Sequence, residues 1–227
     1  MKIEDAFRVA ESWRYKYGMS EASIAFIDDW AYKHTGLYPP SNKITQEPEF
    51  LEPAVKLSAI FQSLLMAGGE DPLGVFLSEF DKSGVKHNAF FPTASCVSDL
   101  MSQILMDGDT GRGANDLYEP CCGTGSITLK KLENIYHQNI DLDFPLGDVK
   151  LYAEDINPTA LKAFLIQLLF KLQYLQEVGG KPSIMKDVKL VLGNTLTQKN
   201  MKLFYHLTDP RLELSEQAEE TTEQVTA

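Results

Sequence analysis

The segment EPCCGTG at residues 119–125 has residue types that are suited to chemistry. Its two glycines can adopt backbone angles that are closed to other residues, and they let a ligand approach the main chain. Glu119 is placed to accept hydrogen bonds from a ligand amine or hydroxyl. Thr124 or Ser126 is placed to cap a following helix, whose first amides would face an anionic or polar group. The segment is therefore either a ligand-binding loop or a plain strand-to-helix turn that uses glycines for its geometry.

The adjacent cysteines Cys121 and Cys122 raise the alternatives of a metal site and a nucleophile. Zinc ligands are usually two to four residues apart so that both side chains point inward, which neighbouring cysteines cannot easily do. A nucleophilic cysteine needs a positioned histidine base, and the four histidines are scattered along the chain: His34, His87, His137 and His206. The preferred interpretation is that both cysteines are small apolar side chains packed under the loop. With Cys96 the cysteine count is odd, which indicates reduced thiols in a cytoplasmic protein.

A second polar position follows the segment LYAED at residues 151–155, which ends in Glu154 and Asp155. A carboxylate at the carboxyl end of a parallel strand commonly accepts hydrogen bonds from both hydroxyls of a ribose. The alternative for Asp155 is a helix cap ahead of Pro158. Two strand ends with complementary polar groups favour ligand binding over a plain turn.

The elements that must position these residues alternate between strand and helix patterns. Strands are predicted at 115–120, 149–155 and 188–196, with helices at 125–139 and 157–180. Strands separated by crossover helices form a parallel sheet, and ligands bind at the carboxyl ends of its strands. The sequence therefore predicts an α/β layer of the nucleotide-binding type.

The first 90 residues show helical spacing of apolar side chains instead. Gly18 is a plausible end of the first helix, and Ser20 is a possible cap of the second. A stretch with several prolines, 37–53, reads as a loop. Helices are predicted at 3–18, 20–36, 53–69 and 71–84, with a further one entered through Pro92 and Thr93.

Charge and hydropathy exclude several classes of protein. The net charge is −11, and the five glutamates of residues 213–227, which have no Lys or Arg, contribute nearly half of it. This stretch is predicted to be disordered. Strong nonspecific DNA binding needs clustered Lys and Arg, and no such cluster is visible, so DNA as a partner is not supported by charge. The sequence has no apolar run long enough for a transmembrane helix, and its charged, amphipathic beginning is unlike a secretory signal peptide.

Four segments, in this order, resemble adenine-specific DNA methyltransferases of the type found as modification subunits of type I restriction systems. YEPCCGTGSITL resembles the family's D/E-P-x-x-G-S/T-G loop, which binds S-adenosylmethionine. AFFPTASCVSDLM is similar to the aromatic-Thr-Pro segment near the methionine part of the cofactor, and AEDINPTALKAF to the segment with the ribose-binding acid. LVLGNTLTQ resembles the segment that borders the adenine pocket. The resemblance covers residues 88 to about 200 and implies a Rossmann-like S-adenosylmethionine-dependent methyltransferase fold with a partial parallel sheet and an N-terminal helical region.

The resemblance also implies roles for single residues. The cofactor loop would include Glu119, Cys121, Gly123 and Gly125, and Asp155 would bind the ribose. The remaining cofactor-binding positions would be Ile156 against the adenine ring, Asn194 where many members have Asp, and Phe91 and Thr93, whose order around Pro92 departs from aromatic-Thr-Pro.

The largest departure from the family concerns catalysis. The family holds the target adenine with a D/N/S-P-P-Y/F motif, whose aromatic ring stacks on the flipped base. The nearest candidate here is Asp209-Pro210, followed by Arg211 and Leu212 after a short strand, so the chain reads as truncated before the catalytic motif. A protein that binds the cofactor or a partner without catalysis is favoured, for example one that acts on a restriction or defence complex in an anti-restriction role. The alternative is an active adenine methyltransferase, alone or with a second subunit, in which Asp209 accepts the amino group and Phe204 or Tyr205 stacks on the base.

These expectations divide the chain into three parts. Residues 1–87 form an N-terminal helical region, 88–212 a methyltransferase-like cofactor-binding domain, and 213–227 an acidic tail.

Overall fold

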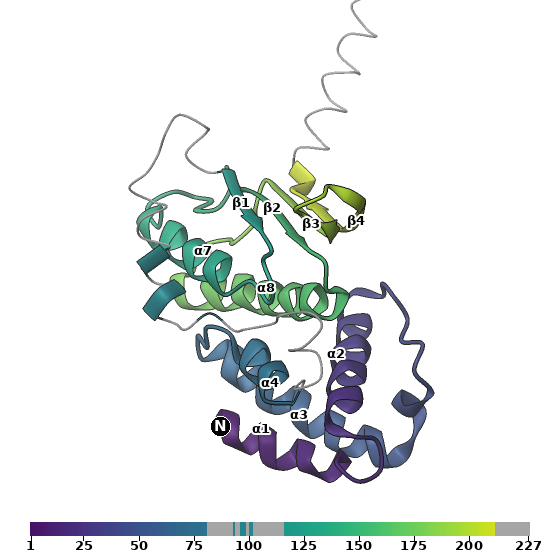
Figure 1. Cartoon of the computed structure of the whole chain (residues 1–227). Helices are drawn as coiled ribbons and strands as arrows, with labels where there is room; N and C mark the ends of the chain where they lie inside the picture. Colours follow the sequence, from purple (N-terminus) through teal and green to yellow (C-terminus); the bar gives the residue numbers. More distant parts are fainter. Residues whose placement is uncertain (81–92, 94–95, 99, 102–115, 212–227) are drawn as a thin grey trace, which may run out of the picture.

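Three parallel strands come from the segments in which buried and exposed side chains alternate. The structure, a computed structural model, describes residues 1–80, 93, 96–98, 100–101 and 116–211 (Figure 1). The strands are β1 (Asp116–Pro120), β2 (Lys150–Asp155) and β3 (Asp187–Asn194). Their inward side chains, such as Leu117, Leu151 and Leu190, are almost fully buried. The predicted strands are confirmed to within one or two residues.

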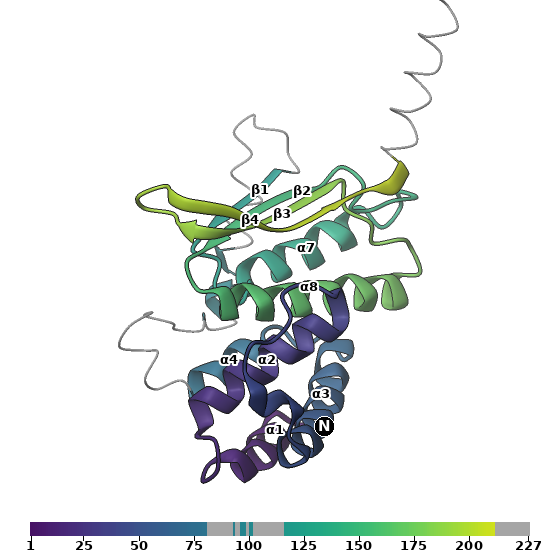
Figure 2. The same ribbon diagram turned by 90° about the vertical axis from the view of Figure 1, so that its right-hand side faces the viewer.

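The strand order is β1-β2-β3-β4, and both β1–β2 and β2–β3 are parallel pairs. Helix α7 (Ser126–Gln138) joins β1 to β2, and helix α8 (Pro158–Gly179) joins β2 to β3. Because crossovers are right-handed and each new strand is added on the same side of the last, both helices lie against one face of the sheet, as Figure 2 shows. The predicted α/β arrangement with a mostly parallel, open sheet is confirmed, and it is compatible with a Rossmann-like fold.

The fourth strand corrects the sequence prediction, which had only a short strand before Asp209. Strand β4 (Lys199–Thr208) has ten residues and pairs with β3 in the antiparallel direction. It is joined to β3 by a tight connection that ends at Gln198, and both Gln198 and Asn200, the second residue of β4, have positive φ. The antiparallel direction returns the chain to the amino-terminal edge of the parallel strands.

The N-terminal segments form a layer of helices on the outer side of α8, so that the sheet, the α7–α8 pair and these helices are stacked (Figures 1 and 2). Their core is rich in aromatic rings, including Trp13 and Phe50, which stack at 4.8 Å between ring centroids. The same core reaches Ala163, Ile166 and Phe170 of α8. The helices are α1 (Ile3–Ala10), α2 (Met19–Thr35), α3 (Pro48–Met66) and α4 (Pro72–Phe80), with short 3-10 helices at Glu11–Trp13 and Lys43–Gln46.

Three details of this region differ from the prediction. The first helix was predicted to extend to Gly18, but α1 ends at Ala10 and a 3-10 helix, Glu11–Trp13, follows it. Helix α3 begins at Pro48 rather than at Pro53, which lies inside the helix. A proline at the first helical position loses no intrahelical bond, so Pro48 is a favourable start. Ser20 does not cap α2, because the helix begins one residue earlier, after Gly18.

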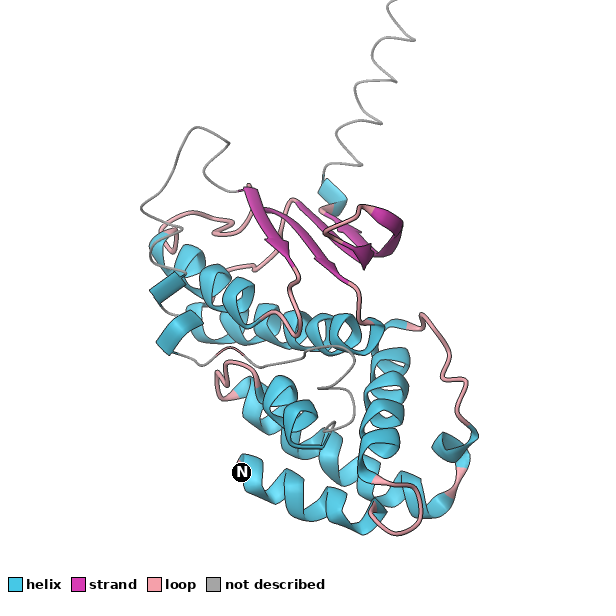
Figure 3. Ribbon diagram, in the orientation of Figure 1, coloured by secondary structure: helices cyan, strands magenta, loops and turns pink. Residues whose placement is uncertain are grey.

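The secondary structure is shown by type in Figure 3. Within the described residues, no helix is both long and apolar enough to cross a membrane. The helix predicted after Pro92 and the acidic tail fall largely or wholly outside the described residues.

Candidate functional site

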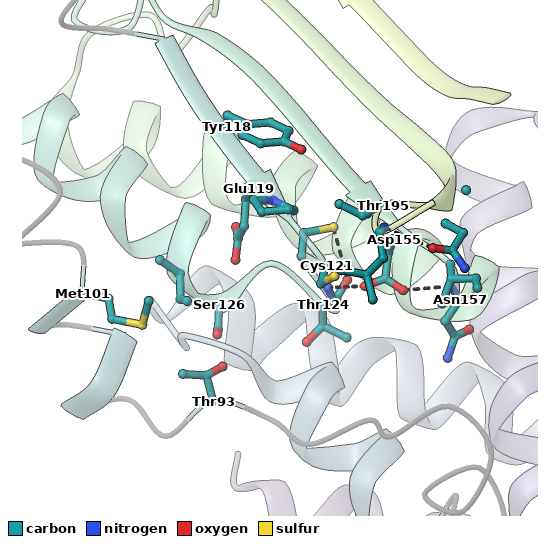
Figure 4. A pocket seen from close by; sticks show the side chains of 18 of the residues that line it. Thr93, Met101, Tyr118, Glu119, Cys121, Thr124, Ser126, Asp155, Asn157 and Thr195 are labelled. Carbon is teal, nitrogen blue, oxygen red and sulfur yellow. Dashed lines mark hydrogen bonds between the residues drawn. The ribbon is translucent and has the colours of Figure 1, made fainter. Parts of the chain in front are cut away.

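A cavity of about 700 Å³ lies at the carboxyl ends of β1, β2 and β3. Its wall includes the 119–124 segment, the end of β2 and the end of β3, together with Asp71 and Thr93 from other parts of the chain. Figure 4 shows Thr93, Glu119, Cys121, Thr124 and Asp155 among the side chains around the opening. The location is the one at which open parallel sheets bind ligands, and the volume is in the range of small-molecule sites.

The loop after β1 is a sharply folded turn in which three residues have left-handed backbone angles. Cys121 has φ 56°, Gly123 has φ 56° and Gly125 has φ 83°. The backbone N–H of Cys122 donates to the carbonyl of Glu154 at 2.8 Å, which ties the loop to β2. A left-handed angle at a residue other than glycine is uncommon and costs about 1 kcal/mol or more. The loop geometry is therefore enforced by its surroundings rather than by local preference.

The two cysteines have different environments. Cys122 is buried, as predicted, and its burial raises the pKa of the thiol well above its usual value. Cys121 is exposed and lines the cavity, so the prediction that it packs under the loop is wrong. Among the described residues, no group of three or more His, Cys, Asp or Glu side chains is arranged to hold a metal ion.

Asp155 fixes the loop from the end of β2. Its Oδ2 accepts the backbone N–H of Gly123 at 2.7 Å, and its Oδ1 accepts the backbone N–H of Asn157 at 2.7 Å (Figure 4). The cap of α8 is Asn157, whose Oδ1 accepts from Thr159 and Ala160. The alternative prediction that Asp155 caps the helix ahead of Pro158 is therefore wrong. A carboxylate has about four acceptor positions, so two backbone donors leave capacity for a ligand.

Glu119 has a structural role besides its place in the cavity wall. One carboxylate oxygen, Oε2, accepts from the backbone N–H of Thr128 at 3.2 Å and also from the hydroxyl of Thr128. Thr128 is the third residue of α7, so Glu119 serves the first turn of this helix. Neither Thr124 nor Ser126 caps the helix, because its cap residue is Gly125 and no side chain bonds there. Burial raises the pKa of Glu119 to about 7.

The raised pKa of Glu119 predicts a pH dependence of stability. A group whose pKa is higher in the folded state stabilises the fold below its unfolded pKa, and this contribution is lost as pH rises through the folded pKa. For Glu119 this loss falls in the pH window between its ordinary pKa of 4.5 and its folded-state pKa of about 7. We expect the ligand-free chain to lose roughly 2 kcal/mol of unfolding free energy through this group across the window, after allowance for solvent screening. Urea unfolding at several pH values measures the loss, and the Glu119→Gln variant should show a shallower dependence. Parallel curves for the two proteins would contradict the prediction.

Asp71 belongs to the cavity wall but was not identified from the sequence. It precedes α4 and accepts from the backbone N–H of Gly74 at 2.9 Å, the hydroxyl of Thr124 at 2.8 Å and the amide of Gln167 at 2.8 Å. The Gln167 amide also donates to the carbonyl of Thr124 at 2.9 Å. Burial raises the pKa of Asp71 to about 6. The hydrogen bond from Thr124 to Asp71 joins the N-terminal helices directly to the glycine loop. An Asp-Pro pair before a helix indicates a cap, but no local signal places it against a loop more than 50 residues away.

The remaining predicted residues are distributed as follows. Thr93, Ile156 and Asn194 line the cavity with the loop residues. The side-chain oxygen of Asn194 accepts the backbone N–H groups of residues 196 and 197, at 3.1 and 3.0 Å. Gly125 lies beneath the loop against the ring of Phe164 rather than in the cavity wall. Phe91 lies outside the described residues.

Asp209, the candidate catalytic residue, is not brought to the cavity. It follows β4, whose last residue Thr208 pairs with Asp187 at the start of β3, so it lies at the opposite edge of the sheet. Its backbone N–H donates to the carbonyl of Lys186 at 3.1 Å, and its carboxylate is paired with Arg211. That contact holds the pKa of Asp209 below its usual value. Phe204, a candidate for base stacking, instead stacks on Tyr38 at 4.5 Å between centroids.

The charges around the cavity have one sign. Asp71, Glu119 and Asp155 are in its wall, and no Lys, Arg or His is among the described residues that line it. Moreover, Glu119 already occupies an amide of the first turn of α7, where a phosphate would otherwise bind. The arrangement is therefore suited to a cationic or neutral ligand with hydroxyl groups and is unfavourable for a polyphosphate.

Comparison of the chain with family models, with curated proteins and with solved structures finds no significant match.

Proposed function

We propose that the chain binds S-adenosylmethionine in the cavity at the carboxyl ends of β1–β3. This ligand is a nucleoside with two ribose hydroxyls and no phosphate, and its sulfonium and ammonium cations outweigh its one carboxylate, so that its net charge is positive. The observation that carries the proposal is the set of three carboxylates, Asp71, Glu119 and Asp155, around a cavity whose described wall has no basic side chain. Opposite charges within a partly desolvated site attract more strongly than they do in water.

The segments that resemble the methyltransferase family support the same ligand. Thr93, the glycine loop, Asp155 with Ile156, and Asn194 come from four separate segments, yet they surround one cavity. In this arrangement Asp155 accepts the ribose hydroxyls, and the exposed side chain of Ile156 lies against the adenine ring. The carboxylates of Asp71 and Glu119 face the cationic methionine part.

The proposal concerns binding of the cofactor and does not assign methyl transfer to this chain alone. Asp209 lies at the far edge of the sheet and is paired with Arg211. Transfer to an adenine amine would need an acceptor for that amine beside the cavity. The active adenine methyltransferase therefore remains the alternative in which a second subunit supplies this group.

Titration calorimetry with four ligands that contain adenosine, two without phosphate and two with it, tests the proposal. We expect S-adenosylmethionine to bind with a Kd in the micromolar range, which corresponds to a binding free energy on the order of −8 kcal/mol. S-adenosylhomocysteine, which lacks the sulfonium charge, should bind several-fold more weakly if the carboxylates attract the cation. ATP and NAD should give no binding heat, because their phosphates meet carboxylates instead of cations. Equal binding of ATP, or no heat with S-adenosylmethionine, would overturn the proposal.

A further inference from the structure

A second cavity adjoins the first one, which lies at the carboxyl ends of the strands. It has a volume of about 710 Å³ and lies between the N-terminal helices and the start of α7. Asp71, Thr93 and Ser126 line both cavities, so these three side chains mark the boundary where the cavities meet. Figure 4 shows Thr93 and Ser126 in the wall of the first cavity. The volume of the second cavity is in the range of small-molecule sites.

Most of the surface of the second cavity is apolar. Its aliphatic side chains come from three helices and are Ile3, Leu64, Pro72 and Val75. The charged residues of its described wall are Lys2, Glu70 and Asp71. Two carboxylates and one ammonium group do not attract the phosphate backbone of a nucleic acid. The cavity is therefore suited to a small apolar ring rather than to a base of a DNA strand.

Asp71 provides a hydrogen-bond acceptor at the boundary between the two cavities. Its Oδ1 accepts from the backbone N–H of Gly74 and from the amide of Gln167. Among the described residues, its Oδ2 accepts only from the hydroxyl of Thr124, at 2.8 Å. A carboxylate oxygen has about two acceptor positions, so Oδ2 can accept one more bond from a ligand.

Gly74 leaves the space in which the carboxylate of Asp71 lies. It is the third residue of α4, and its backbone angle is not left-handed. A Cβ at this position would collide with the carboxylate of Asp71. Because glycine is unfavourable inside a helix, its presence here fits a requirement for the carboxylate at this place.

The position of the second cavity relative to the cofactor rests on the proposed binding of S-adenosylmethionine in the first cavity. In that arrangement Asp155 and Ile156 contact the adenosine, and Asp71 and Glu119 face the cationic methionine part. Since Asp71 also lines the second cavity, this cavity opens beside the sulfonium. The methyl group that can be transferred is bonded to the same sulfur.

We propose that the second cavity binds a small aromatic compound with a phenolic hydroxyl, and that this hydroxyl accepts the methyl group of S-adenosylmethionine. The hydroxyl oxygen forms a bond to the methyl carbon while the carbon–sulfur bond breaks, and the electron pair of that bond stays on sulfur. The proton of the hydroxyl passes to Oδ2 of Asp71 and then to water. The products are an aryl methyl ether and S-adenosylhomocysteine.

The choice of a phenol follows from protonation states. An alkyl amine, with a pKa of about 10, is protonated at neutral pH and has no free electron pair with which to attack. A phenol, whose pKa is also about 10, is neutral at this pH and keeps both its electron pairs and a proton to donate. Burial raises the pKa of Asp71 to about 6, which makes it a stronger base than an ordinary carboxylate.

The first experiment measures binding to the chain without S-adenosylmethionine. Calorimetry should show saturable binding of 2-naphthol, whereas 2-methoxynaphthalene, which has no proton to donate, should bind at least about tenfold more weakly. Val75→Trp should fill the second cavity and weaken the binding of 2-naphthol at least about tenfold. It should leave the binding of S-adenosylmethionine unchanged, because Val75 lines the second cavity and not the first. The matched control is Val55→Trp, at a position on α3 that is 64% exposed and lines neither cavity, and it should bind both compounds as the wild-type chain does.

The second experiment measures methyl transfer at saturating S-adenosylmethionine. We expect 2-naphthol to be converted to 2-methoxynaphthalene by the wild-type chain and by Val55→Trp, but not by Val75→Trp. Asp71→Asn keeps the shape of the side chain and removes the base. It should therefore lower kcat at least about 100-fold, with a smaller change in the KM for 2-naphthol.

The remaining outcomes separate this inference from the proposed function. If S-adenosylmethionine binds but 2-naphthol does not, or is not methylated, this inference alone is overturned. If S-adenosylmethionine gives no binding heat, the proposed function fails and the transfer fails with it. Weaker binding of S-adenosylmethionine to Val75→Trp would show that the second cavity holds the methionine part of the cofactor itself, and an unchanged kcat in Asp71→Asn would refute its role as the base. Either result would overturn the inference.

Discussion

The Asp155→Ala variant is expected to bind S-adenosylmethionine at least about 100-fold more weakly than the wild-type chain. Charge-assisted hydrogen bonds contribute about 1.5–3 kcal/mol each, and the two bonds to the ribose hydroxyls together exceed the roughly 2.8 kcal/mol that corresponds to a factor of 100. The variant also frees the N–H groups of Gly123 and Asn157, which Asp155 holds at 2.7 Å each. The loop would then lose part of the arrangement that shapes the cavity.

Calorimetry with two further variants separates these contributions. Asp155→Asn keeps one acceptor oxygen and should show an intermediate loss of affinity. Asp187→Ala removes an acidic side chain from the first residue of β3, at the edge away from the cavity, and should bind the ligand as the wild-type chain does. If Asp155→Ala bound as tightly as Asp187→Ala, the assignment of the ribose site would be wrong.

The parts of the fold that the sequence predicted are those governed by local patterns. Short strand-like segments between the helical ones placed β1, β2 and β3, and helical spacing placed α7 and α8. The ends of parallel strands must meet at one edge of the sheet, so the position of Glu119 close to Asp155 followed from their strand ends alone. The site could therefore be outlined before any tertiary contact was known.

The parts that were missed depend on contacts between distant segments. Asp71 joins the cavity wall because Gln167 and Thr124 hold it there, and these residues lie 96 and 53 positions away. The misplacement of Asp209 has a similar cause. A parallel β4 would have ended near the cavity, whereas the antiparallel pairing with β3 carries Asp209 to the other edge.

The cap of α7 shows a subtler failure of local reasoning. Thr124 and Ser126 are residue types that favour caps, but tertiary partners engage both hydroxyls. Thr124 donates to Asp71, and Ser126 accepts from Ser98. The helix is instead served by Glu119, which reaches it from the preceding strand. Residue preference predicted that a polar side chain would accept from the backbone N–H groups in the first turn of α7. Tertiary packing determined that this side chain is Glu119.

The Gly125→Ala variant is expected to lose about 3–5 kcal/mol of unfolding free energy, the largest effect on stability among single substitutions in the loop. Gly125 has φ 83°, and a Cβ there would lie 2.1 Å from Cδ2 of the Phe164 ring. Phe164 is fully buried, so the ring has little room to move away. The substitution therefore combines backbone strain with a clash in the core beneath the loop.

Urea unfolding of Gly180→Ala provides the matched control. Gly180 ends α8 with φ 68°, and nothing lies within 4 Å of the position of its Cβ. Its substitution should cost only the backbone strain of about 1 kcal/mol. The difference between the two variants isolates the contact with Phe164, and in a Phe164→Leu background the cost of Gly125→Ala should fall. Equal losses for Gly125→Ala and Gly180→Ala would show that the loop does not rest on this ring. The glycine would then be required for its backbone angle alone, and the close approach of the loop to α8 would not be what holds the cavity open.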